Sequence, residues 1–188
     1  MIILFLIGFF ILLFIIGLLW ILVPALYGLP SVPTKRERIR KALQLVDLKL
    51  DETIYNLGAG DGCVLLIAAR KFDAKAVGIE IGPVQYALIW LRLVASGVGE
   101  RATIKLGNFY KADLKDADVV FVYATSKEVA KLGSYLEKQM KPDARVVSIS
   151  ADFPNWEPQI IDDRQLIFVY AMPPTHGSLT SYLLKNVK

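Results

Sequence analysis

The chain has 188 residues, enough for one globular domain and a short appendage but not for two full domains. Its formal net charge is +4, and residues 35–41 account for all of it, with five basic residues against one acid. The other charges balance, so the composition does not predict a nucleic-acid-binding surface. One Cys and one His exclude an internal disulfide and argue against a metal site built on these residue types.

The N-terminal residues predict a single membrane-spanning helix. Ile2 to Val23 form an unbroken run without a charged or strongly polar side chain, and Pro24 follows. At about 1.5 Å per residue this run is about 33 Å long, enough to cross a hydrocarbon core of roughly 30 Å. A cleaved signal peptide is the competing interpretation, but no basic residue precedes the run and no small-residue cleavage site follows it. We therefore expect residues 1–28 to form a membrane anchor.

The orientation of this anchor follows from the residues after it. Trp20 and Tyr27 lie near the C-terminal end of the run, where amphipathic rings favour the membrane interface. The basic cluster starts at Lys35, so the positive-inside rule places the N-terminus outside and the rest of the chain in the cytoplasm. The protein is then single-pass. The cluster either contacts anionic headgroups or forms a solvated helix face.

The segment after the anchor predicts a linker and then a first helix. Residues 29–34 contain two prolines in four positions, which disfavours a helix and extends the chain. Thr34 is placed to act as the N-cap of a helix over residues 35–46. The spacing of apolar residues predicts one buried face of this helix: Ile39, Leu43 and Val46. The globular domain therefore comprises residues 35–188.

From Thr53 onward, predicted strands and helices alternate. The strands are predicted at Thr53–Leu57, Ala76–Glu80, Thr103–Leu106, Asp118–Tyr123 and Arg145–Ile149, and the helices at Val64–Arg70, Val84–Ser96 and Lys127–Met140. This alternation implies right-handed crossovers and a parallel sheet covered on both faces, which is a doubly wound α/β fold. Two final apolar segments, Gln165–Ala171 and Ser178–Leu184, predict a closing antiparallel hairpin.

A glycine-rich loop follows the first strand, where a doubly wound sheet binds its ligand. The loop reads Gly58, Ala59, Gly60, Asp61 and Gly62, and its glycines let the backbone approach a bound group closely. A dinucleotide fingerprint requires a glycine where Cys63 stands. Asp61 would also repel a pyrophosphate, whereas it suits a cationic sulfonium. The loop therefore favours S-adenosylmethionine over a nicotinamide dinucleotide.

Three further positions complete the predicted cofactor site. Glu80 ends the second strand, where a carboxylate accepts hydrogen bonds from both hydroxyls of a ribose. Asn108 follows the third strand and is placed to bond the base, with Phe109 beside it; a turn-forming Asn and a core Phe explain the same pair. Asn56, two residues before the loop, adds a hydrogen-bonding side chain.

These motifs together resemble a known family. The loop from Leu57 to Gly62, the Gly78-Ile79-Glu80 segment and the Phe-Pro-x-Trp-x-Pro segment at residues 153–158 are similar to the FAM173-type protein lysine methyltransferases. The resemblance covers residues 32–158. It implies a class I, Rossmann-like methyltransferase fold, S-adenosylmethionine as cofactor, no metal, and a membrane-associated enzyme that methylates a lysine of a membrane protein.

The chain departs from this family pattern at three places. Asn56 stands where the family usually has Asp, Cys63 stands where Arg is common, and Ala151-Asp152 interrupts the segment before Phe153. Asn56 lacks a charge that would face the sulfonium. A non-catalytic module that binds S-adenosylmethionine is therefore an alternative function.

A lysine nucleophile has a reference pKa of about 10.4 and must lose a proton before it attacks a methyl group. The predicted catalytic residues, Tyr123, Asp152 and Trp156, follow the fourth and fifth strands. Aromatic walls align an amine, and Asp152 or Tyr123 accepts its proton through water. Strand-end packing for Tyr123 and a lid over the core for Trp156 are the structural alternatives.

Several other residues have no predicted catalytic role, and two other functions fit parts of the sequence. Lys127, Glu128 and Lys131 are expected to form a solvated helix face, and Cys63 to be a packing residue. A membrane anchor equally suits a methyltransferase that acts on a lipid or a quinone. A nicotinamide dehydrogenase is the weakest alternative, because the dinucleotide fingerprint is incomplete.

Overall fold

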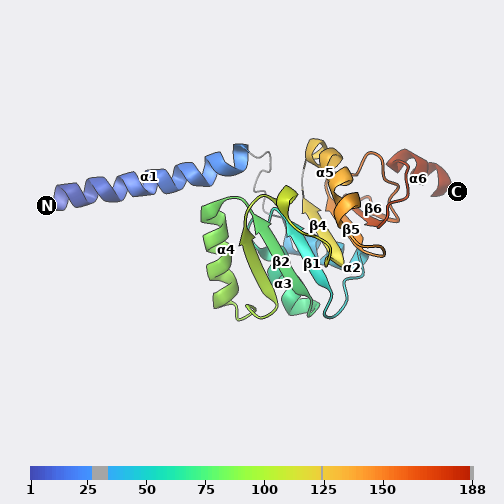
Figure 1. Cartoon of the computed structure of the whole chain (residues 1–188), viewed down its shortest axis with the longest axis horizontal. Helices are drawn as coiled ribbons and strands as arrows, with labels where there is room; N and C mark the ends of the chain where they lie inside the picture. Colours follow the sequence, from blue (N-terminus) through green and yellow to red (C-terminus); the bar gives the residue numbers. More distant parts are fainter. Residues whose placement is uncertain (27–33, 124, 187–188) are drawn as a thin grey trace.

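The computed structural model describes residues 1–26, 34–123 and 125–186 (Figure 1). Its strands are β1 (Thr53–Leu57), β2 (Lys75–Glu80), β3 (Ala102–Leu106), β4 (Val119–Tyr123), β5 (Arg145–Ile149), β6 (Ile160–Asp162) and β7 (Ile167–Ala171). Its helices are α1 (Ile2–Leu26), α2 (Arg36–Leu45), α3 (Cys63–Lys71), α4 (Pro83–Ala95), α5 (Ser126–Gln139) and α6 (Leu179–Asn186), with one 3-10 turn, η1 (Phe109–Lys111). The predicted linker, residues 29–34, lies outside the described residues except for Thr34.

One seven-stranded sheet forms the centre of the domain, in the order β3-β2-β1-β4-β5-β7-β6. The strands from β3 to β5 are parallel, which confirms the predicted doubly wound α/β fold. The strand order reverses between β1 and β4, so the carboxyl ends of these two strands form the crevice where such sheets bind ligands.

Two hydrophobic cores cover the two faces of the sheet. On one face α2, α3 and α4 bury apolar side chains that include Leu43, Leu65 and Ile89 against Phe121 of β4. On the other face α5 buries Leu132 and Leu136 against the strands, together with aromatic residues from the C-terminal part. The predicted apolar face of the first helix is confirmed, since Ile39, Leu43 and Val46 are all buried.

The start of α2 differs from the sequence prediction. The helix begins at Arg36, and Lys35 occupies the N-cap position without a side-chain hydrogen bond. The backbone of Lys35 is extended, and its carbonyl accepts hydrogen bonds from the N–H groups of Arg38 and Ile39. The prediction that Thr34 caps this helix is therefore wrong by one residue.

The C-terminal hairpin is present, but the strand that pairs with β7 is β6, which precedes it, and not residues 178–184. β6 and β7 pair antiparallel, and β7 also pairs antiparallel with β5. Residues 178–184, predicted as a strand, instead begin α6. Ser178 Oγ accepts a hydrogen bond from the N–H of Ser181 at 3.2 Å, while Ser181 Oγ accepts one from the N–H of Ser178 at 2.7 Å. This reciprocal pair is a capping box, which starts a helix rather than a strand.

Helix α1 projects away from the domain (Figure 1). Residues Ile2–Trp20 are long and apolar enough to cross a membrane, and none of this window is buried by the rest of the protein. The helix continues past Pro24 to Leu26. Its large apolar side chains have no protein core to enter, so the domain does not explain their hydrophobicity.

Candidate active site

The glycine loop after β1 is held in a conformation that needs glycine. Gly58, Gly60 and Gly62 have φ angles of 82°, 61° and 74°. A Cβ on Gly62 would lie 2.9 Å from Ile89 Cγ2, so α4 packs directly against the loop there. At Gly60 the nearest atom to a Cβ would be the Gly58 oxygen at 4.0 Å. The loop therefore leaves open space beside Gly60, where a ligand can approach the backbone.

Glu80 links the end of β2 to this loop. Its side chain is only 6% exposed, and Oε2 accepts a hydrogen bond from the N–H of Gly60 at 2.9 Å. Oε1 accepts one from the N–H of Gly82 at 3.0 Å. A carboxylate has about four acceptor positions, so each oxygen keeps capacity for a further donor such as a ribose hydroxyl. Glu80 is thus held rigidly beside the glycine loop, and its bond to a ribose stays a prediction.

Asp61 lies in the loop but turns toward the start of α3. Its Oδ1 accepts a hydrogen bond from the N–H of Cys63 at 2.9 Å, and its Oδ2 lies 3.6 Å from Arg92 Nη1 of α4. Burial, together with the hydrogen bond to Asp61, raises the pKa of the Cys63 thiol. Cys63 is therefore a neutral packing residue, as expected. Asp61 forms an ion pair with Arg92, and its interaction with a sulfonium stays a prediction.

The other predicted cofactor residues lie on β1, in the glycine loop and after β3: Asn56, Ala59, Asn108 and Phe109. Asn56 is buried in β1 between Gly78 of β2 and Phe121 of β4, and Ala59 is buried in the loop. Asn108 Oδ1 accepts a hydrogen bond from the N–H of Tyr110 at 2.9 Å, which caps η1, and Phe109 is buried in the core. Asn108 is therefore a turn-forming residue and Phe109 a core residue, which are the structural alternatives to adenine binding. Contact of either residue with an adenine stays a prediction.

A cavity of about 590 Å³ lies at the carboxyl end of β4, beside this crevice. Its walls are Tyr123 of β4, the start of α2 and residues 164–166 in the turn between β6 and β7. Gln165 contributes an unusual feature, because its Oε1 is buried and has no hydrogen-bond partner among the described residues. A buried acceptor without a partner is costly unless a ligand donates to it.

Arg38 closes one wall of this cavity. Its Nε donates to the Gln165 carbonyl oxygen at 2.7 Å, and Nη2 donates to the same oxygen and, at 3.0 Å, to Ser150 Oγ. The guanidinium thus fastens α2 to the β6–β7 turn and to the end of β5. Sequence reasoning counted Arg38 only as a charge, because its partners are more than 100 residues away in the chain.

The three predicted catalytic residues have different surroundings. Tyr123 is half-buried and lines the cavity. Asp152 is half-buried just after β5, but it is not one of the described residues that line the cavity. Trp156 is 2% exposed, stacks on Phe153 with ring centroids 4.2 Å apart, and donates its indole N–H to Glu137 at 2.6 Å. The ring of Trp156 therefore packs in the core, which is the structural alternative given for it, and its contact with substrate stays a prediction.

Comparison with known proteins identifies the family. The family model described as the ANTKMT methyltransferase domain matches residues 56–160. A protein-lysine N-methyltransferase of Saccharolobus islandicus is 35% identical over 131 residues, which cover 69% of this chain and 81% of that protein. The chain belongs to this methyltransferase family. Its members are S-adenosylmethionine-dependent protein-lysine methyltransferases. The glycine loop and Glu80 predicted the cofactor, and the family resemblance implied the lysine substrate.

More distant family members act on known proteins. A human lysine N-methyltransferase that acts on a subunit of ATP synthase is 26% identical over 146 residues, which cover 76% of this chain and 60% of that enzyme. The mouse adenine nucleotide translocase lysine N-methyltransferase is 26% identical over 156 residues, which cover 83% of this chain and 67% of that enzyme. This chain therefore spans about two thirds or less of these two relatives.

A solved methyltransferase has the same fold. An RNA methyltransferase from Salinibacter ruber, in complex with S-adenosyl-L-homocysteine, superposes with a TM-score of 0.73 and 30% sequence identity. The match covers 75% of this chain and 94% of that one.

In our structure, no group of three His, Cys, Asp or Glu residues among the described part of the chain could hold a metal ion.

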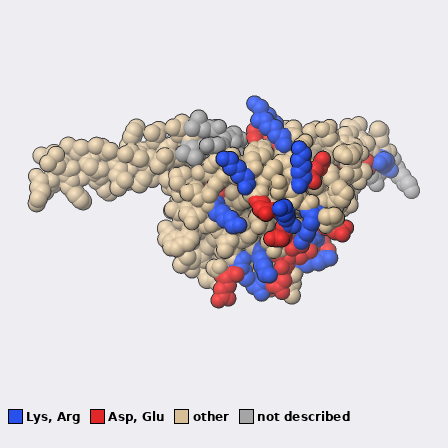
Figure 2. Space-filling model, in the orientation of Figure 1, with Lys and Arg blue, Asp and Glu red and all other residues tan. Residues whose placement is uncertain are grey.

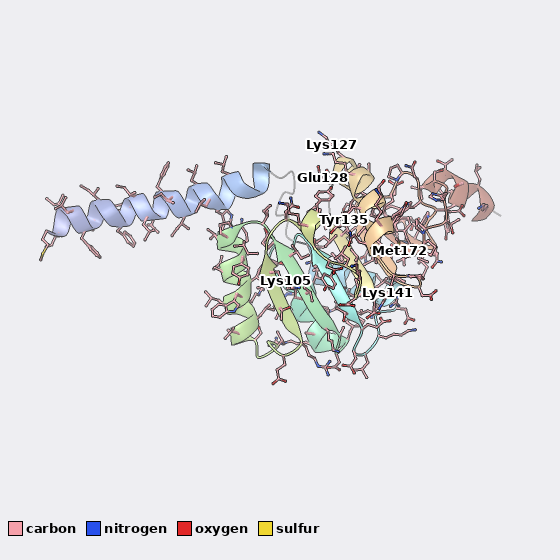
Figure 3. All side chains as sticks on the ribbon, in the orientation of Figure 1. Lys105, Lys127, Glu128, Tyr135, Lys141 and Met172 are labelled. Atoms are coloured by element: carbon pink, nitrogen blue, oxygen red, sulfur yellow. The ribbon has the colours of Figure 1, made fainter. Side chains whose placement is uncertain are left out.

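Glu128 is buried, which differs from the sequence prediction. It was expected on a solvated helix face with Lys127 and Lys131, but it is 9% exposed at the start of α5 (Figure 3). Its Oε2 lies 3.4 Å from the Tyr110 hydroxyl, and its Oε1 lies 3.6 Å from Lys131 Nζ. Burial and the nearby Glu128 carboxylate raise the pKa of Tyr110 to about 12, so Tyr110 remains a neutral donor at pH 7. This pair fastens the segment after β3 to α5.

Proposed function

We propose that this family member is a single-pass membrane protein that methylates a lysine of another membrane protein from the cytoplasmic side. Helix α1 supplies the anchor, since its residues Ile2–Trp20 are apolar and none of this window is buried by the domain. The basic residues that follow it favour a cytoplasmic domain. The substrates of the human and mouse relatives, an ATP synthase subunit and the adenine nucleotide translocase, support a membrane-protein substrate.

The position of the cavity carries this proposal. Four of its lining residues lie within residues 34–38, a few residues after the anchor segment. Even a fully extended chain spans only about 28 Å over the eight steps from Leu26 to Thr34. The substrate cavity therefore stays close to the membrane surface, where a lysine in a loop of a membrane protein can reach it.

The residues at the crevice fit S-adenosylmethionine. Glu80 offers acceptor positions for ribose hydroxyls, and the open space beside Gly60 admits the nucleoside to the loop backbone. S-adenosylmethionine, when bound, supplies an electrophilic methyl group to an in-line displacement. The protein's own part is then to position a neutral amine, because this reaction needs orientation more than a strong catalyst.

The charges around the cavity favour a neutral lysine. Lys35, Arg38 and Arg164 all line it, with Glu37 as the acid among them. Nearby cations disfavour another ammonium and thus lower the pKa of a lysine that enters. Glu37 attracts the incoming ammonium through its opposite charge. Tyr123 aligns the amine, and the Asp152 carboxylate receives its proton through intervening water molecules.

The test uses the full-length protein, its native membranes and methyl-labelled S-adenosylmethionine. We expect label in a membrane protein, recovered as methyllysine after hydrolysis, and much weaker label with Glu80→Ala at a limiting concentration of S-adenosylmethionine. Label in the organic extract would replace the proposal with a lipid or quinone methyltransferase. Binding of S-adenosylmethionine without transfer to any membrane fraction would point to a non-catalytic module.

A further inference from the structure

Helix α4 exposes an apolar surface that the domain leaves uncovered. Its inner side is buried through Gln85, Ile89 and Leu93. Four large side chains on its other sides are about half exposed: Leu88 at 49%, Trp90 at 51%, Leu91 at 54% and Val94 at 57%. A helix that is apolar on all sides normally has partners on all sides. A cluster of exposed apolar side chains marks a surface that contacts a partner or a membrane.

The placement of α4 matches that of the anchor. Figure 1 shows α4 at the end of the domain from which α1 projects, and α4 runs across the direction of α1. Figure 2 shows no charged side chain on α1 or on the adjoining edge of the domain, whereas acids and bases gather over the rest of this face. If α1 crosses a bilayer, α4 therefore lies along the plane of its surface.

A specific hydrogen bond joins the two helices. In a helix the carbonyl of Trp20 would accept from the N–H of residue 24, but residue 24 is a proline and has none. Gln85 Nε2 of α4 donates to this Trp20 oxygen instead, at 2.9 Å, and Gln85 is only 2% exposed. Unpaired backbone groups are costly at membrane depth, so this bond stabilises α4 at the level of Trp20.

We propose that α4 is an interfacial helix, with Leu88, Trp90, Leu91 and Val94 inserted into the surface of the lipid bilayer that α1 spans. The proposal rests on the anchor proposed above. A lipid surface is the occupant because the apolar surface of α4 adjoins that of α1. Arg92 lies at the edge of this surface, half-buried, with Nη1 donating to the Asp61 carbonyl oxygen at 2.6 Å. Docking of α4 thus fixes the orientation of the glycine loop relative to the membrane.

The test measures how deeply single residues enter the bilayer of lipid vesicles that contain this protein and no other. Full-length protein with Cys63→Ala receives one new cysteine, Ile11→Cys, Val94→Cys or Lys138→Cys, each carrying an environment-sensitive fluorophore. The vesicles contain phosphatidylcholine and phosphatidylglycerol with quencher-labelled acyl chains. Positions 94 and 138 are both exposed, on α4 and α5, so neither substitution removes core packing.

We expect several-fold stronger quenching at positions 11 and 94 than at position 138. Quenching at position 11 with none at 94 would overturn the docking of α4 while the anchor stands. Quenching at neither position would overturn both proposals. Quenching at position 94 that appears only after membrane proteins are added would overturn the docking of α4 on lipid, because a protein would then be its partner.

A functional readout complements the depth measurement. Leu91→Glu combined with Val94→Glu places two charges on the exposed surface of α4, with Lys138→Glu as the matched control. We expect a several-fold higher KM for a membrane-protein substrate and an unchanged Kd for S-adenosylmethionine. An unchanged KM would contradict the proposal.

Discussion

The two halves of the sheet are held together in different ways. On the cofactor side, Glu80 and the glycine loop are bonded partners only 20 residues apart in the chain. On the substrate side, Arg38 bonds Gln165 across 127 residues, and the cavity exists only because α2, β4 and the β6–β7 turn meet. Cofactor binding is thus encoded locally, whereas the substrate cavity depends on the complete fold. Substitutions can therefore change the two halves independently.

The largest effect should come from the core of the substrate half. Trp156→Ala removes a fully buried ring and its hydrogen bond to Glu137, and should lower the free energy of unfolding by about 3–5 kcal/mol. Trp156→Phe should cost less, because most of the packing remains. Thermal unfolding measures both variants. Methyl transfer abolished in a variant of unchanged stability would return Trp156 to the catalytic site.

On the cofactor half, Glu80→Ala should abolish most binding of S-adenosylmethionine. Charged hydrogen bonds contribute about 1.5–3 kcal/mol, so we expect the Kd to rise roughly 10- to 100-fold. Calorimetric titration measures the Kd, and the exposed Glu100→Ala is the control. Equal affinities for the two variants would remove Glu80 from the cofactor site.

Arg38→Ala tests the substrate half without touching the cofactor loop. Loss of its bonds to Gln165 and Ser150 should loosen the cavity wall and lower kcat/KM for a protein substrate roughly tenfold. The Kd for S-adenosylmethionine should stay unchanged, as should both quantities in Lys41→Ala, an exposed position on the same helix. A raised Kd in Arg38→Ala would show that the two halves are coupled.

The smallest effect concerns Asp118, which directly precedes β4 at the amino-terminal end of the parallel strands, opposite the crevice. Burial alone would raise its pKa, but Lys141 Nζ at 2.6 Å (Figure 3) and the N–H of Thr53 at 2.7 Å hold the pKa below its ordinary value. The ionised carboxylate therefore stabilises the fold above its unfolded pKa of about 3.9, and this contribution is lost as the pH falls through the lower folded value.

Asp118→Asn should accordingly lower the free energy of unfolding by about 1 kcal/mol at pH 7. The difference from the unsubstituted protein should shrink steadily below about pH 3.9. Urea unfolding at pH 7 and at a pH below that value measures this. A difference that is constant across the range would mean that the ion pair contributes nothing.

The sequence predicted the parts of the fold that depend on local patterns. The five parallel strands and the glycine loop were found because alternation, glycine spacing and Glu80 all lie in short stretches. The capping box of Ser178 and Ser181 was also local, but the apolar letters after it were interpreted as a strand. The fold class therefore came from periodicity, while the C-terminal helix was missed.

The substrate side could not be predicted in the same way. Nothing near Arg38 or Gln165 in the sequence indicates that they meet, and the burial of Glu128 depends on Tyr110 from another segment. Trp156 lies in the motif that suggested the family, yet its indole N–H is satisfied by Glu137 within the core. Motif residues identify a family even where their role is to hold the fold.

The central claim is that the enzyme acts from the membrane on a protein in the same bilayer. The most direct measurement compares methylation rates for full-length enzyme reconstituted with a membrane-protein fraction in the same vesicles or in separate vesicles. We predict far faster labelling of lysine in the shared vesicles, because tethering raises the effective concentration of substrate. Equal rates in the two arrangements would contradict the account.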